Sequence, residues 1–170
     1  YDAYKKYVID TQYDVPTDIE FKHVENPLVS IIIAVYNHYD LTMQCLNSIK
    51  LNAGIDDYEI IIVDDCSTDE TVNISDHVRN VTVIRNQENL GVLSNCNKAA
   101  KVARGQYIYL LNNDTKLLPD AIKELVDILN NDPNVGAVGS KLIYPDGRLQ
   151  AVGSLLLRKA KINSVGKGEN

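Results

Sequence analysis

The sequence predicts an α/β fold: a mostly parallel β-sheet flanked by helices, with an antiparallel hairpin near the C-terminal end. Three observations support this prediction. The 170 residues are enough for one ordinary domain and too few for two. Apolar, β-branched runs alternate four times with stretches of helical periodicity, which is typical of parallel sheets because each crossover helix packs back onto the sheet. The composition, 45% hydrophobic and 24% charged, is that of a globular protein.

Hydrophobic periodicity sets the order of the predicted elements. Residues 1–27 are predicted to form a short amphipathic helix and a linker, residues 28–154 the α/β domain, and residues 155–170 a tail. The tail has no evident closing element, so we expect the sequence to be a piece of a longer protein. The predicted strands are 28–35, 58–63, 81–84 and 107–111. The predicted helices are 41–53, 67–77, 92–103 and 119–130.

Capping signals mark where the predicted helices begin. Asp40 is predicted to cap the first helix, because a side-chain oxygen at that position accepts a hydrogen bond from an otherwise unpaired backbone N–H. Ser67 and Glu70 are three residues apart and match a capping box. Pro119 suits the first position of the last helix, where no backbone N–H is needed.

The C-terminal part of the sequence has a different pattern. Val135–Gly139 is predicted to be a strand. Leu142–Tyr144 and Leu149–Val152 flank the turn signal Pro145-Asp146-Gly147, and they are predicted to pair as an antiparallel hairpin.

Charge and cysteine content exclude several classes of protein. Seventeen Lys and Arg against 23 Asp and Glu give a net charge of −6, which argues against a protein that binds nucleic acid by neutralising phosphates. Cys45, Cys66 and Cys96 form no CxxC pair, so neither a disulfide framework nor a zinc site is predicted.

No apolar run approaches the roughly 20 residues of a membrane-spanning helix. Residues 1–10 lack the apolar region of a signal peptide. We therefore expect a soluble, cytoplasmic protein.

Polar side chains follow each predicted strand. Tyr36-Asn37 follows the first strand, Asp64-Asp65 the second, Arg85-Asn86 the third and Asn112-Asn113-Asp114-Thr115 the fourth. Ligands of open α/β sheets bind beyond the carboxyl ends of the strands, so these residues should face one crevice. The carboxylates there can accept hydrogen bonds or hold a hard cation. The alternatives are a helix cap for the Asp pair and an Asx-turn for Asp114.

Motifs for several other activities are missing from the sequence. VYNHYD stands after the first strand in place of GxGxxG, and neither GxxxxGK[ST] nor GxSxG occurs, which disfavours a dinucleotide-binding domain, a P-loop enzyme and a serine hydrolase. His23, His38 and His77 have no metal-binding spacing.

Three segments together resemble a known family. VSIIIAVYN, YEIIIVDDCSTDET and NQENLGVLSNCNKAAKVARGQYIYLLNNDT occur in this order, and they resemble the nucleotide-sugar-binding half of a family 2 glycosyltransferase with the Rossmann-like GT-A fold. The resemblance covers about Pro27 to Gly153. LNNDT looks like bacterial members that build surface polysaccharides.

The resemblance implies a role for several residues in binding the nucleotide. Ala34 and Tyr36 would line the base and ribose pocket. Asp65, or its neighbour Asp64, would accept a hydrogen bond from the N–H of a uracil or thymine ring. The implied donor is therefore a UDP-sugar or a dTDP-sugar.

The resemblance also implies a metal site. Asn112-Asn113-Asp114 occupies the place of the family's DxD motif, where Asp114 would ligate Mg²⁺ or Mn²⁺ bridging the diphosphate. Asn112 departs from the pattern, because it stands where an acid is usual and contributes no charge.

The implied reaction transfers a sugar, with inversion, to a saccharide or a lipid-linked acceptor; no nucleic-acid partner is expected. In the family the catalytic base lies in the half that follows, and its identity is unknown here. Asp146, the only acid between Asn134 and Lys167, lies in the predicted turn. We therefore expect this sequence alone to be inactive. Peripheral contact with the cytoplasmic membrane, through regions outside the sequence, stays open.

Other functions also stay open. A sugar-nucleotide nucleotidyltransferase has a related fold, but it would normally show a glycine-rich basic loop after the first strand. A phospho-receiver module would have its Asp pair after the first strand rather than the second. A non-catalytic domain that binds a nucleotide or a partner is the remaining alternative, with Asn112 as its only hint.

Overall fold

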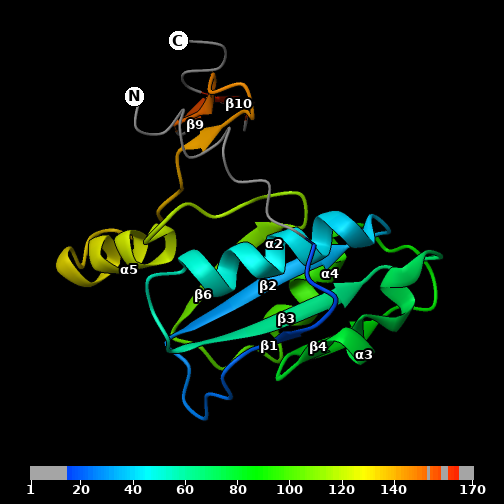
Figure 1. Ribbon diagram of the computed structural model, residues 1–170. Coiled ribbons are helices and arrows are strands. Elements are labelled where there is room, and N and C mark those ends of the chain that lie inside the picture. The colour runs from blue at the N-terminus through cyan, green and yellow to red at the C-terminus, as the bar shows by residue number, and fades with distance from the viewer. Residues whose placement is uncertain (1–14, 153, 158–160, 165–170) are drawn as a thin grey trace. The chain divides into compact units, whose positions relative to one another are not determined.

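Four parallel strands form the central sheet of the computed structural model, in the order β5-β3-β2-β6 (Figure 1). Their bounds are Val29–Val35 for β2, Tyr58–Asp64 for β3, Thr82–Arg85 for β5 and Tyr107–Asn112 for β6. The structure describes residues 15–152, 154–157 and 161–164, so the predicted N-terminal helix within residues 1–12 lies outside the described residues. The four predicted strands and their parallel arrangement are confirmed.

The sheet forms because its two central strands are continuous β-branched runs, which suit a strand covered on both faces. β2 pairs with both β3 and β6, and its isoleucines are almost fully buried. The register aligns the carboxyl ends: Val35 lies opposite Asp64, and Asp64 lies opposite Arg85. On the other side of β2, Ala34 lies opposite Asn112.

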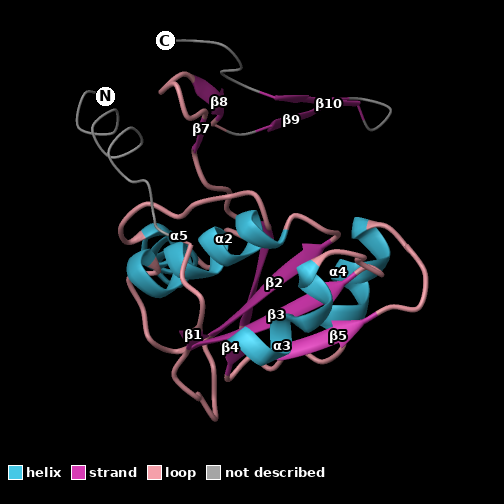
Figure 2. Ribbon diagram, turned by 45° about the vertical axis from the view of Figure 1, so that its right-hand side comes forward, coloured by secondary structure: helices cyan, strands magenta, loops and turns pink. Residues whose placement is uncertain are grey.

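Helices connect these strands (Figure 2). Helix α2 (Tyr39–Asn52) links β2 to β3, and in Figure 1 it crosses in front of the sheet. The short η1 (Glu70–Asn73) and α3 (Ile74–His77) lead towards β5, and α4 (Val92–Ala100) links β5 to β6. α4 packs through Ala99 on the sheet face that carries Ile32 and Ile61. Crossovers between parallel strands are right-handed. The chain moves from β2 to β3 in one direction across the sheet through α2, and from β5 back to β6 in the other direction through α4. α4 therefore covers the face of the sheet opposite α2.

The predicted starts of two of these helices are wrong. His38, in a left-handed conformation, occupies the N-cap position of α2, and Asp40 lies in the first turn instead. Ser67 and Glu70 form no capping box, because Asp69 caps η1 by accepting a hydrogen bond from the Thr71 N–H at 3.0 Å. In both cases the conformation of the preceding loop, rather than the local sequence pattern, decides which residue caps the helix.

A second, two-stranded parallel sheet was not predicted. It pairs β1 (Ile19–Glu20) with β4 (Val78–Arg79), and the Asn80 side chain extends the contact by donating to the Phe21 carbonyl at 2.7 Å. Strands of two residues leave no periodic pattern in a sequence, which explains why they were missed.

Gly105, just before β6, lies where no side chain fits. A Cβ atom built there would be 2.5 Å from the backbone nitrogen of Ser30 and 2.7 Å from the carbonyl carbon of Val29. The Gly105 N–H donates to the Ser30 hydroxyl at 2.8 Å. The absence of a side chain thus lets the chain enter β6 in contact with β2.

Of the described residues, 15–119 belong to one structural unit, and those from Asp120 onwards belong to a second. In the second unit, α5 (Ala121–Asn131) begins after a left-handed Asp120, so Pro119 is not its first residue as predicted. The predicted hairpin is confirmed as β7 (Leu142–Ile143) paired with β8 (Leu149–Ala151). The strand predicted at 135–139 is wrong, because that segment has no regular structure.

The part of the chain predicted to be a tail contains two further strands. β9 (Ser154–Leu157) pairs with β10 (Lys161–Ser164) in an antiparallel arrangement. The predicted domain boundaries, after residues 27 and 154, stay predictions.

Candidate functional site

The candidate site lies at the carboxyl edge of the central sheet. The strand order reverses between β2 and β6, and at such a switch point open α/β sheets bind their ligands. Tyr36 follows β2 and is half exposed there, while Ala34 is partly exposed within a strand that is otherwise buried. Asn112 and Asp114, at the end of β6, are exposed. The register of the strands therefore brings residues from distant parts of the sequence to one edge.

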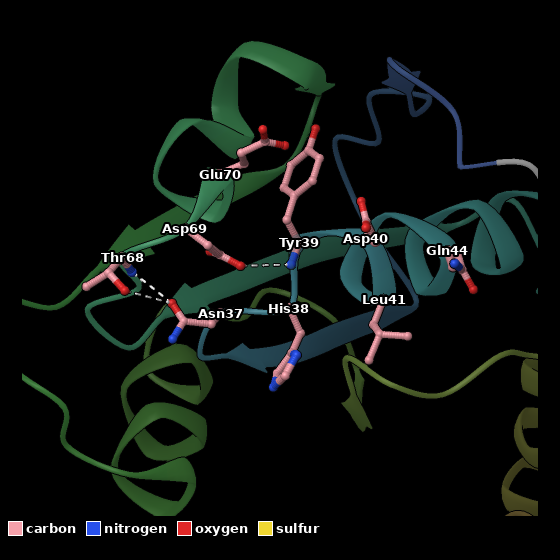
Figure 3. A pocket seen from close by; sticks show the side chains of 9 residues that line it. All are labelled: Asn37, His38, Tyr39, Asp40, Leu41, Gln44, Thr68, Asp69 and Glu70. Carbon is pink, nitrogen blue, oxygen red and sulfur yellow. Dashed lines mark hydrogen bonds between the residues drawn. The ribbon is translucent and has the colours of Figure 1, made fainter.

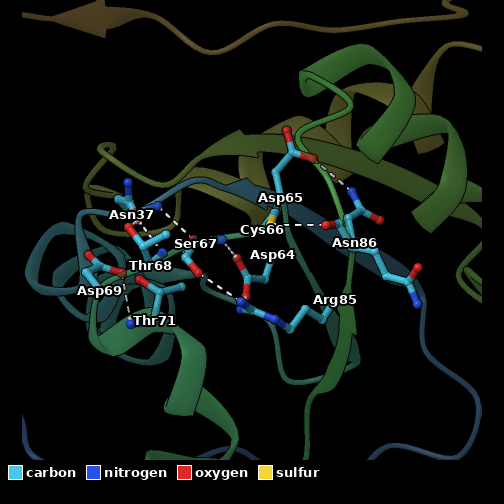
Figure 4. A network of polar contacts seen from close by, with 11 residues as sticks. Asn37, Asp64, Asp65, Cys66, Ser67, Thr68, Asp69, Thr71, Arg85 and Asn86 are labelled. Carbon is cyan, nitrogen blue, oxygen red and sulfur yellow. Dashed lines mark hydrogen bonds and ion pairs between the residues drawn. The ribbon is translucent and has the colours of Figure 1, made fainter.

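Asp64 is fully buried and neutralised by an ion pair. Its Oδ2 pairs with the guanidinium of Arg85 on the neighbouring strand, and its Oδ1 accepts a hydrogen bond from the Ser67 N–H at 2.9 Å (Figure 4). Arg85 also donates to the Ser67 carbonyl at 2.8 Å. Ser67 lies in the loop before η1, and Asp69 is the residue that caps η1, so the contact between Asp64 and Ser67 shapes the loop and does not cap the helix.

Asp65, also buried, is held by uncharged donors. Its Oδ1 accepts from the Leu90 N–H at 2.8 Å and from the Asn86 amide at 2.9 Å, and its Oδ2 accepts from the Gly91 N–H at 2.9 Å. Burial raises the pKa of Asp65, but these hydrogen bonds outweigh burial, and the pKa lies below its usual value. Asp65 is therefore ionised and fixes the loop that leads into α4.

Asn86 extends this network towards the surface. Its amide nitrogen also donates to the Asn95 Oδ1 at 2.6 Å, and its own Oδ1 accepts from the Lys98 ammonium at 2.8 Å. Asn86 and Asn95 are both buried. The sequence analysis missed the role of Asn95, because an asparagine inside a helix gives no signal of its partners.

Left-handed backbone conformations gather in the two loops beside the site. Asn37, His38 and Cys66 have φ values of 57°, 60° and 65°. Non-glycine residues adopt this conformation at a cost, and such strain concentrates at functional sites. The loops after β2 and β3 are thus held in their shapes by contacts rather than by backbone preference.

These two loops also border an open hollow of about 800 Å³ (Figure 3). Its lining includes three acidic side chains, Asp40, Asp69 and Glu70. The N–H of Tyr39 donates to Asp69 across the hollow at 3.1 Å. The remaining lining residues are Asn37, His38, Leu41, Gln44 and Thr68.

The segment after β6 is anchored to α2. The Asn113 amide donates to the Thr42 hydroxyl at 3.0 Å, and the Cys45 thiol donates to the Asn112 carbonyl at 3.6 Å. Burial, then the nearby charge of Asp114, raises the pKa of Cys45 to about 12, although a hydrogen bond from the Thr115 N–H opposes the shift. Cys45 is therefore a neutral thiol beneath the candidate site.

A comparison with protein families identifies the chain. The sequence model of glycosyl transferase family 2 matches residues 30–167. The chain belongs to glycosyltransferase family 2. This finding confirms the resemblance that the three sequence segments indicated.

Similar proteins support the same assignment. Chondroitin synthase of Escherichia coli is 39% identical to this family 2 chain over 115 residues, which are 66% of this chain and 17% of that protein. The structure of S. aureus TarS in complex with UDP-GlcNAc matches with a TM-score of 0.55 at 26% identity, over 61% of this chain and 31% of that chain. Mannosyltransferase PcManGT from Pyrobaculum calidifontis, in complex with GDP-Man and Mn²⁺, matches with a TM-score of 0.56 at 25% identity, over 79% of this chain and 40% of that chain.

The chain matches only part of each similar protein. It spans less than half the length of each of these similar proteins. Within the residues that the structure describes, no helix is long and apolar enough to cross a membrane.

The carboxyl edge of this family 2 domain offers few ligands for a metal ion. In the described part of the chain, no three His, Cys, Asp or Glu side chains are grouped so that they could hold an ion. Asp114 is one exposed carboxylate, and Asn112 beside it is an exposed amide. Mg²⁺ is commonly bound through one or two carboxylates together with substrate phosphates. These residues fit a cation that arrives with a diphosphate rather than one held by the protein alone.

Proposed function

We propose that this domain binds a nucleoside-diphosphate sugar as the donor of a family 2 glycosyltransferase. The observation that supports it most is the position of Tyr36, the Asp64-Asp65 pair and Asp114 along one carboxyl edge, at and beside the switch point of a sheet from this family. The solved relatives TarS and PcManGT are complexes with UDP-GlcNAc and GDP-Man. We propose a uridine or thymidine diphosphate sugar for this chain.

The nucleoside is proposed to bind over the end of β2. The half-exposed Tyr36 ring offers a face for the base, and Ala34, which is small and partly exposed, leaves room for the ribose. Asp64 or Asp65 is proposed to accept the base N–H. The two oxygens of a carboxylate offer about four acceptor positions. The contacts described above use two of these positions in Asp64 and three in Asp65, so each carboxylate can still accept a hydrogen bond from the base.

The diphosphate is proposed to lie beside the end of β6. Asp114 would hold Mg²⁺ or Mn²⁺, with Asn112 as a neutral neighbour and with Asn113 fixing the segment through Thr42. When bound, the cation would neutralise the negative charge that develops on the leaving diphosphate. Asp114 orients the diphosphate, while Tyr36 and the buried acids orient the nucleoside.

The whole enzyme is proposed to transfer the sugar, with inversion, to a saccharide or a lipid-linked acceptor. Similar proteins named for polymer synthesis or modification, such as chondroitin synthase and a poly(ribitol-phosphate) β-glucosyltransferase, support a polysaccharide product. We place this activity in the cytoplasm, and the free thiols of Cys45, Cys66 and Cys96 suit that reducing compartment.

Calorimetry with UDP tests the donor site. We expect UDP to bind, Mg²⁺ or Mn²⁺ to strengthen binding about tenfold, which is about 1.4 kcal/mol, and Asp114→Asn to remove that metal dependence, because Asp114 is the one charged side chain proposed to hold the cation. Asp56→Asn is the matched control, since Asp56 is an exposed acid near the amino end of β3.

Two results would contradict the proposal. Affinity for UDP that EDTA leaves unchanged in the wild-type protein would remove the metal role of Asp114. Failure of UDP, dTDP and GDP to bind at all would remove the donor site itself.

A further inference from the structure

The loops after β2 and β3 are joined by a reciprocal pair of hydrogen bonds. The Asn37 backbone N–H donates to the Ser67 hydroxyl at 2.8 Å, and the Asn37 Oδ1 accepts from the Thr68 N–H at 2.8 Å (Figure 4). The Thr68 hydroxyl adds a longer contact to the same oxygen at 3.4 Å. We call this set of contacts the Asn37 bridge.

The Asn37 bridge is anchored on the β3 side. The Ser67 N–H donates to Asp64, and the Ser67 carbonyl accepts from Arg85. Ser67 and Asp64 are 1% exposed, so water does not compete for these bonds. A continuous chain of contacts therefore runs from β5 through β3 to the loop after β2.

On the β2 side, the bridge holds the backbone in a left-handed conformation, which costs energy for residues other than glycine. Asn37 and His38 are consecutive left-handed residues, and asparagine is the residue other than glycine that adopts this conformation most readily. The next residue, Tyr39, is held by Asp69. Tyr36 directly precedes the bridge and has half of its surface exposed.

We infer that Asn37 is a positioning residue that fixes the Tyr36 ring over the nucleobase site and thereby sets the preference for one nucleobase over another. This inference rests on the proposed donor site. Asn37 itself touches no reacting atom; it acts through Tyr36 and through the spacing between Tyr36 and the Asp64-Asp65 pair. Loss of the bridge leaves the sheet intact but lets Tyr36 move relative to these acids.

The test measures the ratio of UDP to CDP affinity by calorimetry in four proteins. Asn37→Gly keeps the left-handed backbone and loses the side-chain half of the bridge, whereas Asn37→Asp keeps both an acceptor oxygen and tolerance for that backbone. Asn80→Gly is the matched control, because Asn80 is also left-handed and donates one amide hydrogen bond, to Phe21, away from the site. UDP and CDP carry the same diphosphate, so the effect of the added charge of Asn37→Asp on the diphosphate cancels in the ratio.

We expect Asn37→Gly to lower the UDP to CDP ratio about fivefold to tenfold, the effect of one net hydrogen bond. The wild-type ratio should persist in Asn37→Asp and Asn80→Gly. Should Asn37→Gly not fold, Ser67→Ala removes the other half of the bridge and is expected to lower the ratio in the same way.

The outcomes separate the inference from the proposed function. An unchanged ratio in Asn37→Gly, with UDP binding intact, overturns the role of Asn37 and leaves the donor site standing. Equal binding of UDP and CDP by the wild-type protein overturns the inference as well. A wild-type protein that binds no nucleotide overturns both.

Discussion

At the scale of single residues, two adjacent buried carboxylates are stabilised in different ways. Asp64 is paired with the cation of Arg85, so its burial depends on one charged partner. Asp65 instead accepts from two backbone N–H groups and an amide. Removing a partner from a buried polar group costs more than the contact itself contributes, because the remaining group is left unpaired. Neither residue is therefore a simple surface acid available for any ligand.

The depressed pKa of Asp65 predicts acid-sensitive stability. A carboxyl group whose pKa is lower in the folded protein than in the unfolded chain stabilises the folded protein at pH values above the unfolded pKa, which is about 3.9. This stabilisation is lost as the pH falls through the lower pKa of the folded protein. We expect Asp65→Asn to lower the midpoint of thermal unfolding at pH 7 and to flatten its decline between about pH 4 and pH 2.

Thermal unfolding from pH 7 to pH 2 measures this effect, with Asp76→Asn as the control. Asp76 is exposed on α3, so its replacement should change stability by less than about 0.5 kcal/mol. Parallel curves for wild-type protein and Asp65→Asn below pH 4 would contradict the assignment.

At the scale of elements, the close approach of the chain before β6 to β2 depends on Gly105. We expect Gly105→Ala to lower the free energy of unfolding by about 2 kcal/mol or more, because the new methyl group meets backbone atoms that cannot rotate away. Gly136→Ala is the matched control, since a Cβ atom there meets nothing within 4 Å, and it should have little effect. Urea unfolding of both variants decides the point: equal stability would show that β6 shifts to accept the methyl group.

Elements also show how far the sequence alone predicts the structure. The bounds of the strands β2, β3, β5 and β6 were predicted within about one residue, because continuous apolar, β-branched runs are typical of strands buried in a parallel sheet. The start of α2 was missed, because the Tyr39 N–H donates to Asp69, about 30 residues further along the chain, and the local sequence gives no sign of that contact. The location of the candidate residues at the strand ends followed from the sequence, whereas the partners of Asp64 and Asp65 depended on three-dimensional register.

At the scale of the whole molecule, the proposed donor site has no convincing candidate, among the residues that the structure describes, for the base that activates an acceptor. Asp146 is exposed in the turn between β7 and β8, where it accepts from the Arg148 N–H at 3.0 Å and pairs with its side chain. The hydrogen bond from that N–H, followed by the Arg148 side chain, lowers the pKa of Asp146. A carboxylate with a depressed pKa and a neighbouring cation is a weak base, so Asp146 fits its structural role in the turn.

We therefore expect residues 1–170 alone to bind a nucleotide but to transfer no sugar. Radiolabelled UDP-sugars with saccharide and lipid-linked acceptors, incubated with Mg²⁺ or Mn²⁺, measure transfer, and calorimetry on the same preparation confirms that the site is folded. Metal-dependent transfer by this chain would show that it contains the base, and Asp146→Asn would be the first variant to examine.

The buried thiol of Cys45 gives the molecule an internal reporter. Its sulfur lies under the Asn112 carbonyl, is inaccessible to solvent and is held neutral, so an alkylating reagent reaches it only when the segment after β6 separates from α2. Cys66 and Cys96 are partly exposed and react on a different timescale. The slow phase of labelling therefore measures how often the segment after β6 separates from α2, and we expect a bound nucleotide that holds the segment closed to lengthen that phase without any added probe.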